Sequence, residues 1–449
     1  MSTTLMSLES LHFLLPYMDA NRRLVSFQIP LVTNTIKTFD FRFEIRQRCP
    51  SLREFERNVP LKINSLVLTE SSVILNDTIY QLGIYRKCKA GKVPRHVAEK
   101  NKVGGVPYEV NEYGLKDESN ALPVTPGEVV MSQHKRPLMQ DEDYIESIED
   151  ATQFWEGQLA DLQGMRPSPW NLEGIHQVEQ NIEDCRVHLF DYHCRREKFP
   201  SNYEMFLQLT KSQIVEEQEQ TSVERYKHNK KFSETMKQMT TLLLGGRSSP
   251  VSVKTLEIDF AGSGVIRLPI NLELRIEQLV FRMHSETTVG VLAPILHESS
   301  FPLKKLYINY WSDEDATNTM VKTAESLRIR YIYTDVPQAI SSLTNPLVRI
   351  SNPVVRMPHE QNIERIVRNW IESQRPVGHK YIFDFYSDPR FPNEIEDMAK
   401  ELNGVIIDDE NLIIPMNNAT QLKVSYGSFP DFAPRSKWAV KFLTEAVEH

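Results

Sequence analysis

The chain has 449 residues, 40% of them hydrophobic and 25% charged, a composition typical of globular proteins and a length that predicts roughly two or three domains. Lys and Arg number 52 against 60 Asp and Glu, for a formal net charge of -8. This balance argues against a general nucleic-acid binder, which needs a basic face to neutralise phosphates.

The N-terminal segment carries a helical pattern. Apolar residues recur at intervals of three and four: Leu8, Leu11, Leu14, Leu15 and Met18. No cationic residue precedes this stretch, and Glu9 and Pro16 interrupt it, so it does not predict a signal peptide. A second short helix is expected over about 51–58. No run approaches the eighteen or so apolar residues that cross a bilayer, and we expect no membrane partner.

Residues 59–140 predict a β-rich region with a long loop. Residues 61–68 alternate between apolar and polar side chains, as expected for a strand. Residues 79–85 repeat this pattern after a turn-like Asn76-Asp77. From 87 to 140 the chain contains Gly104-Gly105, several prolines and many charges, which indicate a long loop or an irregular insertion.

Residues 141–246 predict a mainly helical or mixed region. A helix is expected from Asp143, with one apolar face formed by Tyr144, Ile148, Ala151, Trp155, Leu159 and Leu162. Residues 167–170 interrupt this helix. Another helix is predicted over 233–244, with Met236, Met239, Leu242 and Leu243 inward and Gly245-Gly246 at its end.

The C-terminal half, 247–449, predicts an α/β repeat. Strand-like pieces centre on Leu256, Leu279, Leu306 and Ile332, with helical stretches expected at 288–297 and 316–327. A strand followed by a helix every 20 to 29 residues, roughly, is the leucine-rich-repeat period. Because the asparagine of that repeat's consensus is missing, the match is degenerate. A twisted sheet with crossover helices gives the same spacing, and both interpretations stay open.

The last hundred residues predict further elements. Ile363, Ile366, Val367, Trp370 and Ile371 form an apolar helical stripe. A strand is expected at 381–385, a helix from an Asn393 cap through Leu402, and a hairpin over 405–415. The final element, 438–447, is predicted as a helix. The fold class is therefore α+β: a short helical N-terminus, a mixed β-rich middle, and a repeat-like or twisted-sheet C-terminal half.

The densest cluster of metal-capable side chains is Cys185-x-x-His188-x4-His193-Cys194. It lacks the second ligand pair of a zinc finger, so a buried thiol with surface imidazoles is the simpler interpretation. Gly245-Gly246-Arg247 lacks the lysine and the spacing of a P-loop, and a helix end followed by a turn explains it better. The acidic run at 408–410 is typical of a solvated hairpin tip. We therefore predict no metal and no cofactor.

The histidines bear on whether the protein is an enzyme, and the cysteines bear on its cellular compartment. No Ser-His-Asp or Cys-His arrangement is recognisable among the 12 histidines, and we expect no enzyme. Four cysteines in so long a chain are typical of reduced thiols, which predicts the cytoplasm or the nucleus.

Several stretches resemble one protein family. They are Leu8-Glu-Ser-Leu-His-Phe-Leu-Leu-Pro-Tyr-Met, Phe43-Glu-Ile-Arg-Gln-Arg-Cys-Pro and, near the C-terminus, Val367-Arg-Asn-Trp-Ile-Glu-Ser-Gln. They are similar to a nematode-expanded F-box-like family that carries a domain of unknown function, with an F-box-associated C-terminal region. The first stretch is followed by Arg22-Arg23, and in that family this Arg-Arg pair runs almost directly into the Phe-Glu-Ile block. Here residues 24–42 intervene, and we hypothesise that they are a retained intron.

The resemblance implies a substrate-recognition adaptor of a cullin-RING ubiquitin ligase. An F-box docks on a Skp-type adaptor protein, and the rest of the chain presents a surface to a protein substrate. The docking contacts implied by the resemblance are Leu8, Leu11, Leu14, Leu15 and Pro16, within an F-box-like segment 1–58. The alternative is a non-enzymatic scaffold or binding protein without ligase docking.

Overall fold

The computed structural model describes residues 57–58, 60–91, 93–117, 124–131, 141–166, 168–215, 218–260, 264–282, 288–332, 336–351, 361–385, 398–408, 410–417, 419–427 and 438–447. The F-box-like docking residues Leu8, Leu11, Leu14, Leu15 and Pro16 lie outside these ranges, as do the segment 24–42 and the Asn393 cap. The predictions made for them stay predictions.

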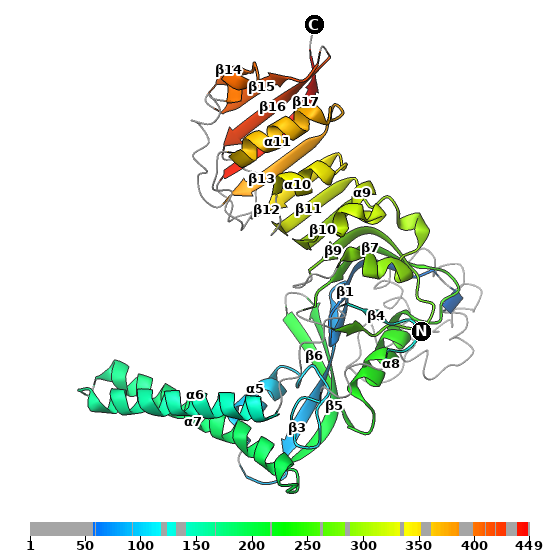
Figure 1. The fold of residues 1–449 in the computed structure, drawn as a ribbon. Helices are drawn as coiled ribbons and strands as arrows, with labels where there is room; N and C mark the ends of the chain where they lie inside the picture. Colours follow the sequence, from blue (N-terminus) through cyan, green and yellow to red (C-terminus); the bar gives the residue numbers. More distant parts are fainter. Residues whose placement is uncertain are drawn as a thin grey trace, which may run out of the picture.

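A sheet of fifteen strands runs through the described part of the chain (Figure 1). Its antiparallel first part holds β1 (Lys62–Leu68), β2 (Ser72–Leu75), β3 (Thr78–Cys88), β5 (Tyr203–Val215) and β6 (Gln218–Lys227). β1 then pairs in parallel with β7, so strands from the N-terminal and C-terminal halves share one sheet. The predicted strands at 61–68 and 79–85 are confirmed.

The middle of the sheet is parallel. It consists of β7 (Val251–Ile258), β9 (Leu274–Phe281), β10 (Lys305–Trp311), β11 (Ser326–Ile332), β12 (Leu347–Ser351) and β13 (Lys380–Phe385). Each strand pairs with the next one along the chain. An antiparallel end follows, formed by β17 (Trp438–Ala446), β16 (Thr420–Gly427), β15 (Asn411–Pro415) and β14 (Val405–Asp408).

The helices lie beside this sheet or project from it. They are α5 (Arg95–Lys102), α6 (Asp141–Gly164), α7 (Pro169–Arg196), α8 (Phe232–Leu244), α9 (Thr319–Thr323), α10 (Val336–Ser342) and α11 (Gln361–Glu372). Short 3₁₀ turns are η2 (Val289–Ile295), η3 (Glu298–Ser300) and η4 (Asp315–Thr317). A separate pair of short strands is β4 (Val129–Val130) with β8 (Val265–Ile266). The described fold is thus mixed α+β and rich in strands.

One row of buried side chains runs across the parallel strands and forms the centre of the core. In register these residues are Leu66, Leu256, Leu279, Leu306, Leu327, Val348, Tyr381 and Phe442. Trp370 of α11 packs on this row, with its ring 4.7 Å from that of Tyr381 and 5.8 Å from that of Phe442. We call the side of the sheet that carries this row the inner face. Helices α9, α10 and α11 cover it (Figure 1).

The C-terminal element was predicted wrongly. Residues 438–446 form strand β17, which pairs antiparallel with both β13 and β16. Val440, Phe442 and Thr444 are buried while Lys441 and Leu443 are only half-buried, which is the alternation of a strand. The segment becomes a strand because two neighbouring strands offer it backbone hydrogen bonds along its whole length.

Four other predictions need correction. Residues 289–295 form a 3₁₀ turn that contains Pro294, whose missing N–H and ring disfavour an α-helix interior. In 316–327 only the short α9 is α-helical, and Leu327 lies in β11. It is Leu327, rather than Ile332, that lines up with Leu306. The expected loop at 87–140 contains helix α5.

Helices α6 and α7 confirm the predicted break near 167–170 and form a hairpin that projects from the sheet (Figure 1). Ser168 caps α7 by accepting a hydrogen bond from the N–H of Asn171 at 3.1 Å. Two helices that pack only on each other bury little surface, so most side chains of this hairpin remain partly or fully exposed. The predicted helix 233–244 and the hairpin 405–415 are also confirmed, whereas the predicted domain boundaries stay predictions.

A buried polar cluster fixes the base of this hairpin to the sheet. Asp191 of α7 accepts a hydrogen bond from the Tyr203 hydroxyl at 3.1 Å, and both residues are 4% exposed. Arg86 of β3 lies beside them, with its guanidinium 5.8 Å from the Tyr203 ring centroid. Burial raises the pKa of Asp191 to about 6, against a smaller lowering by Tyr203 and Arg86.

Candidate functional site

The side of the sheet opposite the inner face carries polar, cationic and aromatic residues, and we call it the open face. One row across it, in register, is Glu257, Val280, Tyr307, Arg328, Arg349, Ile382, Lys441 and Ser425. The next row is Gln278, Lys305, Ser326, Leu347, Lys380, Leu443 and Lys423. Most of these side chains are half-buried. The helices α9, α10 and α11 lie on the other side (Figure 1).

The two rows contain six cations (Lys305, Arg328, Arg349, Lys380, Lys423, Lys441) and one carboxylate, Glu257. Arg328 and Arg349 lie directly opposite each other on neighbouring strands. Like charges at such positions destabilise a sheet. Partial burial lowers the pKa of Lys441, and the nearby positive charges of Lys380 and Lys423 lower it further. The sheet therefore holds cations together against their mutual repulsion, an arrangement expected at a functional surface rather than at a structural one.

Aromatic rings are interleaved with these cations. The Tyr307 ring lies between two guanidinium groups, with its centroid 5.8 Å from that of Arg282 and 5.5 Å from that of Arg328. At the carboxyl ends of the same strands, Tyr310 and Tyr331 stack with their ring centroids 5.1 Å apart. Arginine and tyrosine are the residue types that contribute most at protein interfaces.

Glu445 of β17 lies close enough to Lys441 to affect its pKa, and two other carboxylates near the rows are paired with arginines. Glu257 binds Arg282 at 2.6 Å, and Asp384 binds Arg349 at 2.7 Å. Asp384 is only 1% exposed and also accepts a hydrogen bond from the Ser351 hydroxyl at 2.9 Å. Because these acids are already neutralised, the charge left to an incoming partner is positive. An acidic partner fits this surface.

The metal-like cluster predicted from sequence lies on α7, where Cys185 and Cys194 are free thiols. Cys194 is buried, and burial raises the pKa of its thiol, with the nearby Asp191 adding to the effect. Among the residues that the structure describes, no group of three or more His, Cys, Asp or Glu side chains could hold a metal ion. The side chain of His188 is not among those described.

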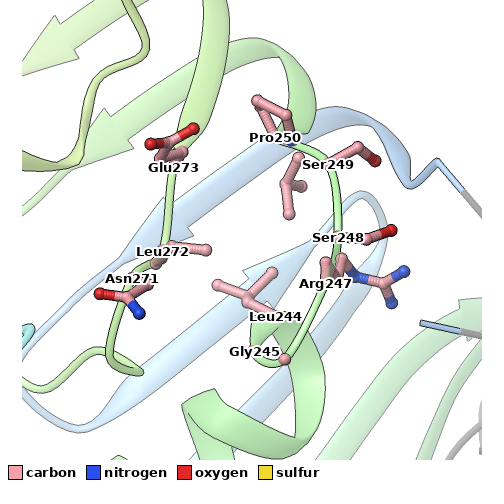
Figure 2. Close-up of a pocket in the computed structure, with 11 residues that line it drawn as sticks. Leu244, Gly245, Arg247, Ser248, Ser249, Pro250, Asn271, Leu272 and Glu273 are labelled. Carbon is pink, nitrogen blue, oxygen red and sulfur yellow. The ribbon is translucent and has the colours of Figure 1, made fainter. Parts of the chain in front are cut away.

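The Gly245-Gly246 segment lines a pocket of about 220 Å³, together with Arg247, Ser248 and Glu273 (Figure 2). Helix α8 ends here, with Gly245 as its C-cap and Gly246 at a φ of 67°. A phosphate prefers the N-terminal end of a helix, where N–H groups point outward, over the C-terminal end, where carbonyls do. The segment is therefore a helix end and a turn, as predicted.

At the acidic hairpin tip, the carboxylate of Asp408 accepts hydrogen bonds from residues of its own turn. Asp408 accepts hydrogen bonds from the Glu410 N–H at 2.9 Å and from the Asn411 side chain at 2.8 Å. These donors lower the pKa of Asp408. Its carboxylate thus stabilises the β14–β15 connection.

The comparisons with known proteins concern the part of the chain that carries the parallel strands. Residues 231–386 match a family described as a domain of unknown function (DUF3557). A DUF3557 domain is therefore present at these residues. It covers about a third of the chain and runs from α8 to β13. No match was found among curated proteins, and none among solved structures. Nothing in these comparisons shows an F-box or a nematode-expanded family.

The open face lies mainly on the DUF3557 domain and continues onto β16 and β17. The sequence signals only part of this face, through the alternation of apolar and polar residues in Ser326-Leu-Arg-Ile-Arg. In the described residues no helix is long and apolar enough to cross a membrane.

Proposed function

We propose that this protein is a non-catalytic binding protein and that its open face binds an acidic segment of a protein partner. The observation that carries the proposal is the pair of rows, in which the cations outnumber Glu257 even though Arg349 is paired with Asp384. Electrostatic complementarity of this kind guides encounter and fixes which partner binds.

A protein segment suits this surface better than a nucleic acid does. Apolar side chains alternate with the cations, among them Val280, Leu347, Ile382 and Leu443. Such residues match apolar side chains of a peptide but offer nothing to a phosphate backbone, which is bound by positive charge.

More specifically, we propose that the protein is a substrate-recognition adaptor of a cullin-RING ubiquitin ligase. Here the open face would hold the substrate, and the N-terminal F-box-like segment would dock on a Skp-type adaptor through Leu8, Leu11, Leu14, Leu15 and Pro16. The resemblance described above supports this step. The consecutive parallel strands also support a leucine-rich-repeat-like solenoid, an architecture that presents broad binding faces. A scaffold without ligase docking is the alternative.

Binding of a labelled acidic peptide, rich in Glu and Tyr, to the full chain tests the open face. Fluorescence anisotropy would compare the wild type with a double variant, Lys380→Glu with Lys441→Glu. Neither lysine is buried, so we expect folded protein whose affinity for the peptide is lower by at least about tenfold. The matched control reverses two exposed lysines near the other end of the sheet, Lys227→Glu with Lys230→Glu, and should bind like the wild type.

Equal loss of affinity in both double variants would show that only net charge matters and would contradict a defined site. Tighter binding of a duplex oligonucleotide than of the peptide, lost in the open-face variant, would replace the proposed partner class.

The ligase step has its own test. A pull-down with a Skp-type adaptor would compare the full chain, a deletion of residues 24–42, and Leu11→Asp with Leu15→Asp. We expect binding by the full chain or the deletion and none by the double variant. Absence of binding by the first two would leave the scaffold alternative.

A further inference from the structure

The helical hairpin formed by α6 and α7 concentrates negative charge. Helix α6 contains eight acidic residues and no Lys or Arg, and α7 contains five acidic residues and three arginines. The formal charge of α6 alone, -8, equals the net charge of the whole chain. The remainder of the protein therefore has nearly balanced charge, and the hairpin is its acidic element.

The hairpin also exposes large apolar side chains. Trp170, at the start of α7, is 85% exposed, and Leu172 and Met165 near the same end of the hairpin are 60% and 58% exposed. Along the helices, Phe154 of α6 is 57% exposed and Phe190 of α7 is 54% exposed. Apolar groups exposed together in this way mark an interaction surface, and tryptophan is the residue type that most often dominates one.

The side of α6 that carries Phe154 combines negative charge with exposed apolar side chains. Asp161 follows Phe154 at an interval of seven residues, which places both on one side of the helix, and Met165 directly follows the end of the helix. All three are exposed, so this side is not part of the seam with α7. An occupant must offer cations together with apolar or aromatic groups.

The open face offers that combination. Its rows hold six cations with Tyr307, Leu347, Ile382 and Leu443 between them. The hairpin projects from the part of the sheet formed by β3, β5 and β6, whereas the open face extends toward β17 at the other end (Figure 1). The two surfaces of one copy therefore lie toward opposite ends of the sheet, and we expect a contact between them to join two copies.

We infer that the α6–α7 hairpin of one copy docks on the open face of a second copy. This inference rests on the proposed function, because it makes the hairpin one acidic partner of that face. The contact joins two different surfaces, so it leaves one free hairpin and one free open face and allows further copies to add. Self-association would also occlude the open face and compete with a substrate.

Sedimentation velocity of the full chain tests this contact. We expect the wild type to associate with rising concentration, more strongly at low salt than at high salt. A hairpin variant, Phe154→Lys with Asp161→Lys, and the open-face variant, Lys380→Glu with Lys441→Glu, should each remain monomeric. Their equimolar mixture should form a dimer that grows no further, because one variant keeps its hairpin and the other keeps its open face.

A matched control changes the charge by the same amount on the exposed strand β6, with Glu219→Lys and Val223→Lys, and should associate like the wild type. Wild-type protein that stays monomeric while still binding the acidic peptide would overturn this inference and leave the proposed function standing. A wild-type protein that neither associates nor binds the acidic peptide would contradict both this inference and the proposed function.

Two other outcomes would also overturn the inference. Association of either variant on its own would indicate a symmetric interface. Binding of the wild type, but not the hairpin variant, to vesicles of neutral lipid would show that this side of the hairpin binds a membrane instead.

Discussion

The buried carboxyl at the base of the hairpin makes the stability of that region depend on pH. Asp191 has a pKa of about 6 in the folded protein, against about 3.9 in an unfolded chain. The folded state thus holds the proton more tightly. Its stabilising effect is complete below about pH 4, falls as pH rises through the interval between the two values, and is lost above about pH 6.

The substitution Asp191→Asn removes this titration and keeps an oxygen that can accept the Tyr203 hydroxyl. The pKa difference of about two units corresponds to about 3 kcal/mol. At pH 7.5 the variant should therefore be more stable than the wild type at this site by about that amount. At pH 4.5 the two proteins should differ by much less.

Hydrogen exchange reports the local opening free energy and suits a chain of this size, because unfolding need not be a single transition. At pH 7.5 amides in the last turns of α7 and in the first residues of β5 should exchange about a hundredfold more slowly in the variant. The exposed Asp161→Asn serves as the control and should leave exchange unchanged. Faster exchange in Asp191→Asn would mean that attraction to Arg86 outweighs desolvation, and would refute the reasoning.

Three further substitutions probe the packing behind the open face, each measured by urea unfolding. Trp370→Phe loses the 2.9 Å hydrogen bond to the Thr444 hydroxyl and part of the core volume, and should cost about 2 to 3 kcal/mol; a neutral result would contradict the buried indole. Arg375→Met removes the guanidinium donors to the Leu343 and Ile340 carbonyls, which keep the Tyr381 hydroxyl and the Leu343 N–H as donors, and should cost about 2 to 3 kcal/mol, with Arg375→Lys recovering only part; an unchanged stability would contradict this. Asn345→Asp sets a carboxylate against backbone carbonyls and should destabilise at pH 7.5 but less at pH 4.5; equal effects would refute this.

The central strands and the amphipathic helices could be predicted because their signals are local. The stripe at 363–371 gives helix α11, with Ile366, Val367 and Trp370 buried. Strand β17 could not be predicted in this way. Its residues 438–446 suit either a helix or a strand, and only the distant partners β13 and β16 decide between them.

The open face was missed for a related reason. Its cations come from six strands, and only their register brings Arg328 beside Arg349 and Lys441 close to Lys423 and Lys380. Buried Asn345, which donates to carbonyls at the end of α9, is likewise invisible to a pattern search because its partners lie more than twenty residues away.

The net charge of the chain does not reveal this surface, because the negative charge of α6 offsets the positive charge of the open face in the total. A value of -8 for the chain is the sum of an acidic hairpin and a remainder of nearly balanced charge that gathers its cations on the open face. At physiological ionic strength, charges are screened within about 8 Å, so the two ends of one copy do not neutralise each other. Each surface therefore remains available to a partner of opposite charge. Composition excludes a uniformly basic protein, but it carries no information about a protein whose charges are segregated.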